Sequence, residues 1–90
     1  MQNKISEIQI IPVRPKNGLV ALASLVFNES FYFNSIGIYT RPQGGYRLTY
    51  PTRKTINNSI TLFHPINKDV AAMVEAAVIE KYEEITAGTV

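Results

Sequence analysis

The chain has 90 residues, of which 46% are hydrophobic and 18% charged, with a net charge of +2, one histidine and no cysteine. This length gives one hydrophobic core, so we expect a single domain over residues 1–90 with a flexible tail at about 86–90. The absence of cysteine excludes disulfide bonds and thiolate metal sites, and the absence of a leader pattern or an apolar run of ~20 residues predicts a cytoplasmic protein without membrane contact.

Four apolar segments predict the strands of an antiparallel sheet. They are rich in β-branched and aromatic residues and cover residues 5–13, 19–27, 31–39 and 46–50. Turn-forming residues lie between them, at residues 14–18, 28–30 and 40–45. Because each connection is short, we expect neighbouring strands to pair antiparallel in chain order.

The next segments are a polar loop, predicted at residues 51–59, and a short apolar run, predicted as a last strand at residues 60–63. Apolar residues then recur at helical spacing from Val70 to Ile85. The predicted fold is α+β, an antiparallel β-meander of four to five strands followed by one C-terminal α-helix.

The ends of the predicted helix carry recognisable signals. Asn67 can cap its first turn, and Asp69 suits the positive end of the helix dipole. Gly88 follows the last periodic residue and can end the helix. We interpret His64, Pro65 and Asn67 as a structural junction between the last strand and the helix.

The second predicted strand indicates an assembly. Both of its faces are largely apolar: residues 19, 21, 23, 25 and 27 on one, and 20, 22, 24 and 26 on the other. One helix covers only one face of a sheet, so we expect a second copy to cover the other face or to pair with an edge strand. A small domain without disulfides commonly gains stability in this way, which predicts a homodimer.

Charge is divided unevenly along the chain. Residues 1–54 hold seven cations and two anions, whereas residues 55–90 hold two cations and five anions. This pattern favours a first half that faces a polyanion. Arg53 and Lys54 stand together after Pro51, with Arg47 and Arg41 before them, and all four can neutralise phosphates. A solvated turn is the alternative interpretation of the basic pair.

The sequence gives little support for catalysis or metal binding. The one histidine, His64, is followed directly by proline, and no serine or carboxylate marks a triad with it. We interpret Glu80, Glu83 and Glu84 as a solvated helix face, because metal sites need several ligands at workable spacing. We therefore expect no enzyme activity, no metal, no cofactor and no small-molecule substrate.

Several stretches together resemble the stage V sporulation protein G (SpoVG, septation regulator) family. They are VALASLVFN at 20–28, PTRK at 51–54, FHPIN at 63–67 and EKY at 80–82, within a similarity that spans roughly residues 4–85. The resemblance implies a dimeric α+β protein that binds DNA, and in some members RNA, and regulates gene expression; in spore formers it is linked to asymmetric septation. On this match, Arg53 and Lys54 take the place of the family's nucleic-acid-contacting basic pair.

The rival hypothesis is a dimeric protein–protein interaction module that does not bind nucleic acid directly. Such a module would dock through the apolar sheet face or through the acidic helix face. The acidic face carries Glu75, Glu80, Glu83 and Glu84, which would repel a polyanion. A test of nucleic-acid binding across ionic strength separates the two hypotheses.

Overall fold

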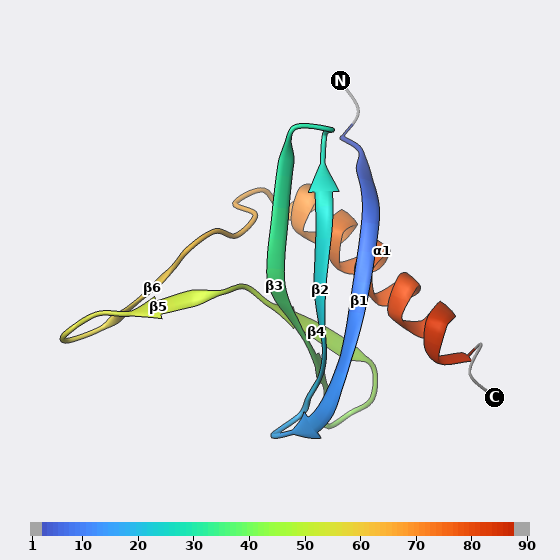
Figure 1. Ribbon diagram of the computed structural model, residues 1–90, viewed down its shortest axis with the longest axis horizontal. Coiled ribbons are helices and arrows are strands. Elements are labelled where there is room, and N and C mark those ends of the chain that lie inside the picture. Colours follow the sequence, from blue (N-terminus) through green and yellow to red (C-terminus); the bar gives the residue numbers. More distant parts are fainter. Residues whose placement is uncertain (1–2, 88–90) are drawn as a thin grey trace.

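The computed structural model describes residues 3–87, which form a four-stranded antiparallel sheet packed against one long helix (Figure 1). The strands lie side by side in chain order as β1 (Ile5–Lys16), β2 (Leu19–Phe27), β3 (Phe31–Thr40) and β4 (Tyr46–Thr49). Helix α1 (Lys68–Ala87) lies behind this sheet, and a second sheet of β5 (Thr52–Lys54) and β6 (Ser59–Thr61) extends to one side. The predicted α+β class, with a meander before a C-terminal helix, is confirmed.

The turn between β1 and β2 shows how local sequence sets the register. Asn17 and Gly18 have φ angles of 54° and 91°, as a two-residue hairpin turn of the primed type requires. Lys16 therefore pairs directly with Leu19. This tight turn lets β1 continue to Lys16, beyond the predicted end of the strand at residue 13.

A β-bulge keeps the apolar residues of β1 on one side. Ile5 and Ile8 are three residues apart, so a regular strand would point them to opposite faces. Glu7 instead has a φ of 50°, and the register with β2 shifts between Ser6 and Gln9. The extra residue brings Ile5, Ile8 and Ile10 all against the core.

The core lies between the sheet and α1 and is built around small residues of β2. Ala21 and Ala23 are almost fully buried there, and the ring of Tyr46 on β4 contacts the ring of Tyr82 on α1 at 5.1 Å between centroids. The buried apolar residues are Ala21, Ala23, Leu25, Ile36, Ile38, Val74 and Val78. No described helix or strand covers the opposite face of the sheet, called here the outer face (Figure 1).

The predicted polar loop at residues 51–59 is wrong in part, because Thr52–Lys54 forms strand β5. The N–H of Thr55 donates to the carbonyl of Asn58 at 2.7 Å, which closes a tight turn and brings the two segments together. The predicted last strand exists as Ser59–Thr61, but it pairs with β5 and not with the meander.

The C-terminal signals are tested only in part. Thr86 and Ala87 belong to α1, and the rest of the flexible tail predicted at about 86–90 lies outside the described residues. The predicted helix stop at Gly88 lies outside the described residues. Within residues 3–87, no helix is long and apolar enough to cross a membrane.

Candidate nucleic-acid interface

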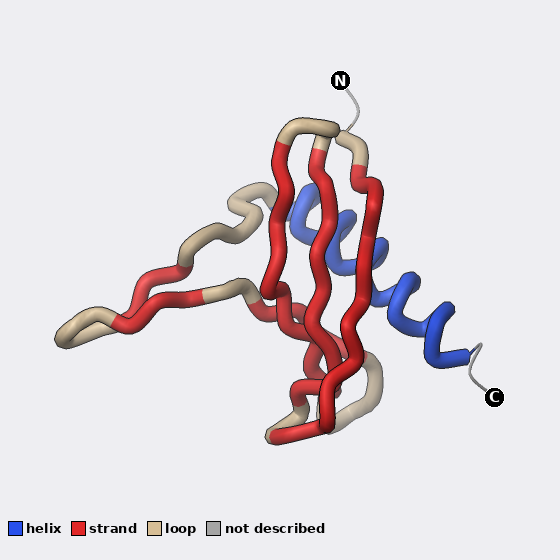
Figure 2. Tube along the Cα trace, viewed as in Figure 1, coloured by secondary structure: helices blue, strands red, loops and turns tan. Residues whose placement is uncertain are grey.

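Residues 51–62 project from the body as a two-stranded arm (Figure 2). The pairing of β4 with β3 ends at Thr49, and Pro51, which has no N–H to donate, marks the departure from that sheet. The N–H of Leu62 donates to the carbonyl of Pro51 at 2.8 Å, which closes the base of the arm. All six residues of β5 and β6 are exposed.

The arm carries two positive charges and no acidic residue. Arg53 and Lys54 both lie on β5, and neither side chain forms an ion pair or hydrogen bond with any part of the chain that the structure describes. The ion pairs that do form lie elsewhere, such as Lys4 with Glu29. Contact with an anion would therefore break no ion pair on the arm.

The other two predicted cations, unlike the pair on the arm, each contact a side chain of the protein. Arg41 lies in the turn before β4, with its Nη2 atom 3.8 Å from Oε1 of Glu75 on α1. The Cζ atom of Arg47, on β4, lies 4.8 Å from the centre of the Tyr39 ring. Because the arm leaves from the far end of β4 (Figure 1), the four cations do not form one cluster.

The two tyrosines near these cations are half-buried and contact other aromatic rings. Tyr46 contacts Tyr82, and the ring of Tyr50 lies edge-on to Phe63 with centroids 6.0 Å apart. Burial raises the pKa of Tyr50 above its ordinary value of 10.0, and the negative charge of Glu75 adds to the effect. Neither ring is therefore free to stack on a nucleic-acid base.

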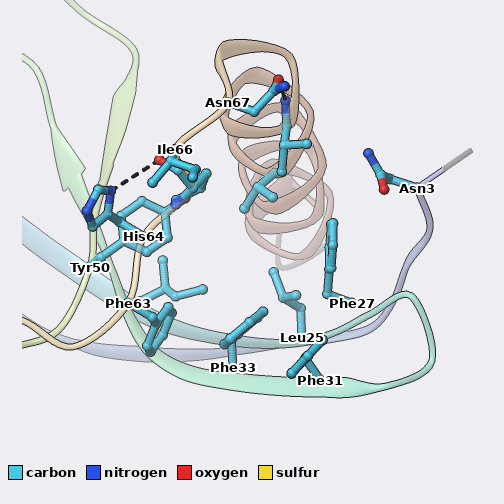
Figure 3. A pocket seen from close by; sticks show the side chains of 14 residues that line it. Asn3, Leu25, Phe27, Phe31, Phe33, Tyr50, Phe63, His64, Ile66 and Asn67 are labelled. Atoms are coloured by element: carbon cyan, nitrogen blue, oxygen red, sulfur yellow. Dashed lines mark hydrogen bonds between the residues drawn. The ribbon is translucent and has the colours of Figure 1, made fainter.

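An aromatic pocket of about 350 Å³ lies where the arm meets the body (Figure 3). The rings of Phe33 and Phe63 stack with centroids 4.7 Å apart, and Ile66 lies exposed beside them. The aromatic residues that line the pocket are Phe27, Phe31, Phe33, Tyr50 and Phe63. The sequence interpretation missed this pocket; its only signal was the density of aromatic residues in the third predicted strand.

The junction residues border the same pocket. Oδ1 of Asn67 accepts hydrogen bonds from the N–H groups of Asp69 at 2.8 Å and Val70 at 3.2 Å, so Asn67 caps α1. Nδ1 of His64 lies 3.1 Å from the carbonyl oxygen of Pro65 (Figure 3). This contact stays within the junction and links no two strands or helices.

The comparisons with known proteins agree on one family. The SpoVG family model matches residues 3–84. The chain is 31% identical over 83 residues to the "Putative septation protein SpoVG" of Caldicellulosiruptor saccharolyticus, which covers 91% of this chain and 93% of that protein. Proteins of the same name from Treponema denticola and Acetivibrio thermocellus are 29% and 26% identical, over 90% and 96% of this chain and 87% and 92% of their own.

Across residues 3–87, no group of three or more histidine or carboxylate side chains is placed to hold a metal ion. The described residues present an exposed cationic arm at one end of β4 and an apolar pocket at its base.

Proposed function

Because the chain belongs to the SpoVG family, we propose that it is a regulatory protein that binds nucleic acid, DNA or RNA, as a homodimer. The relatives' names connect the family with septation. The observation that carries nucleic-acid binding is the arm, where Arg53 and Lys54 stand exposed and form no ion pair within residues 3–87.

Phosphate neutralisation explains how the arm would bind. A cation that contacts a phosphate releases condensed counterions, so the affinity falls with salt at a slope of about 0.9 per contact. If both residues of each copy contact phosphates, the four contacts give a slope of about 3.6 and a roughly hundredfold loss of affinity between 50 and 200 mM salt; one contact per copy gives a slope of about 1.8 and a roughly tenfold loss. Arg41 would first have to leave Glu75, so we rank it and Arg47 as secondary contacts.

The proposed dimer supplies the second arm. Ile11 on β1 and Tyr32 on β3 lie on the outer face and are 61% and 65% exposed. A 90-residue chain buries only roughly 60–65% of its unfolded surface, so covering these side chains would add stability that such a small domain lacks. Two-fold symmetry would also place two cationic arms on one particle.

The test is the affinity of the intact protein for duplex DNA and single-stranded RNA, measured by fluorescence anisotropy from 50 to 300 mM salt. The Arg53→Ala/Lys54→Ala variant should lower the salt slope by about 0.9 per protomer for each of the two residues that contacts a phosphate, and it should weaken binding at low salt. The Arg14→Ala/Lys16→Ala variant is the matched control, because it removes two exposed charges from β1.

Two results would contradict the proposal. One is a wild-type protein that binds neither probe at 50 mM salt; the other is a control variant that loses as much affinity as the arm variant.

A protein-interaction module is the second candidate, and the aromatic pocket favours it. The pocket is open at the protein surface beside exposed Ile66, which suits an apolar side chain of another protein. Failure of both nucleic-acid probes to bind at low salt would support this candidate.

A further inference from the structure

The pairing of β5 with β6 separates the two basic residues of the arm. Residues directly opposite each other in an antiparallel ladder point to the same face, and neighbours along a strand point to opposite faces. Lys54 pairs with Ser59, whereas Arg53 pairs with Ile60. The two cations are adjacent in the sequence but project from opposite sides of the arm.

The face that carries Lys54 is polar throughout. Thr52 pairs with Thr61, two positions from the pair of Lys54 and Ser59, so all four side chains share this face. It presents one ammonium group and three hydroxyl groups, all on exposed residues. We call it the hydroxyl face, defined by Thr52, Lys54, Ser59 and Thr61.

The opposite face is mainly apolar. Arg53 lies opposite Ile60, and the hydrogen bond between Leu62 and Pro51 extends the ladder to a further pair on the same side. Ile60 and Leu62 are 52% and 55% exposed. We call it the apolar face, defined by Pro51, Arg53, Ile60 and Leu62.

We propose that the hydroxyl face is the surface of the arm that lies on the phosphate backbone, with Arg53 turned away from the ligand. The assignment rests on the proposed nucleic-acid binding and specifies how the arm performs it. Serine and threonine hydroxyl groups donate hydrogen bonds to phosphate oxygens, and a lysine ammonium adds a compact charge with three donors. The apolar face would place aliphatic groups against oxygens that need donors, which costs affinity.

The chemistry of the hydroxyl face also predicts which property of the ligand it recognises. Hydroxyl and ammonium contacts with phosphates fix the position of the protein on the backbone and carry no sequence information. The arm should therefore bind duplexes of different sequence with similar affinity, and the same salt slope should apply to each.

Two single-residue variants test the assignment, because each removes one of two positive charges that are adjacent in the sequence. Lys54→Ala should lower the salt slope by about 0.9 per protomer, whereas Arg53→Ala should leave it near the wild-type value. Lys54→Arg keeps the charge and should restore most of the slope, which separates charge from any structural effect of the substitution.

A second pair of variants tests the hydroxyl groups without changing charge. Thr61→Val keeps a β-branched side chain of similar shape and should weaken binding by roughly tenfold, with the salt slope unchanged. Ile60→Thr adds a hydroxyl to the apolar face and should leave affinity near the wild-type value. Both variants retain strong strand formers, so the arm should stay folded.

The outcomes distinguish the two proposals. If Arg53→Ala alone reproduces the loss seen in the double variant, while Lys54→Ala and Thr61→Val bind like the wild type, the face assignment is overturned and the role of the arm stands. If the double variant itself binds like the wild type, nucleic-acid binding through the arm fails, and the face assignment fails with it.

Discussion

Asn67 marks the residue at which the irregular junction becomes a helix. Its Oδ1 atom satisfies two N–H groups of the first turn, and its carbonyl accepts the N–H of Ala71 at 2.9 Å. The N–H groups that Oδ1 satisfies have no acceptor within the helix, so the cap stabilises α1 by about 1 kcal/mol. The cap also holds the start of α1 at the rim of the aromatic pocket.

Tyr50 gives a pH-dependent prediction at the scale of one residue. Burial, helped by Glu75, raises its pKa in the folded state above the ordinary 10.0, so the folded protein holds the phenolic proton more tightly than the unfolded chain. This stabilisation is complete below pH 10 and is lost as the pH rises through the folded-state pKa. Urea unfolding at pH 8 and pH 11 should show a smaller free energy at the higher pH.

The Tyr50→Phe variant is the control for this effect, because it keeps the ring and removes the titrating group. Its free energy of unfolding should fall less than that of the wild type between pH 8 and pH 11. An equal loss in both proteins would show that groups other than Tyr50 cause the alkaline destabilisation.

At the scale of elements, the close approach of β3 and β4 depends on Gly37. A Cβ atom at this position would lie 2.6 Å from Oγ1 of Thr49 and 3.0 Å from Cε1 of Tyr39. Gly37 pairs with Leu22 on one side and with Thr49 on the other. The missing side chain therefore lets β4 take its place at the edge of the sheet.

Overpacking at this site should destabilise the sheet. We expect Gly37→Ala to lower the free energy of unfolding by about 1–3 kcal/mol, as measured by urea denaturation. The Gly37→Ala/Thr49→Ala variant removes the closest contact and should recover part of the loss. Full stability of the single variant would mean that Thr49 moves aside at no cost.

At the scale of the whole molecule, positive and negative charge lie at different ends. The arm, with Arg53 and Lys54, extends to one side, while the end of α1 that carries Glu83 and Glu84 extends to the other (Figure 1). The pair of Arg41 and Glu75 joins sheet and helix between them. A polyanion approaching this molecule is attracted to the arm and repelled by the helix end.

The outer face gives the whole-molecule prediction. If a second copy covers it, Ile11→Asp should weaken the dimer by about tenfold or more, because a charge would be buried in an apolar interface. Sedimentation velocity over a concentration series measures the change. Ile56→Asp is the matched control, since Ile56 is 98% exposed at the tip of the arm.

A wild-type protein that sediments as a monomer at every concentration would contradict the dimer. Equal weakening of the dimer by Ile11→Asp and Ile56→Asp would contradict an interface confined to the outer face.

Sequence alone was sufficient for features that depend on consecutive residues. The Asn17–Gly18 turn, the strand composition, the helical period after Val70 and the capping residue Asn67 each act over a few positions, so their local chemistry predicts the α+β meander with its helix. The basic pair was also visible in the sequence as a candidate binding site.

Tertiary structure decided which segments meet. It paired β6 with β5 instead of the meander, placed Arg41 beside Glu75, and gathered aromatic residues from β2, β3 and the junction into one pocket. It also turned Arg53 and Lys54 to opposite faces, because residues 52–54 form a strand instead of the predicted loop and neighbouring side chains of a strand alternate between its two faces. The Arg41–Glu75 pair and the aromatic pocket join residues distant in the chain, so no local pattern of residues specifies them.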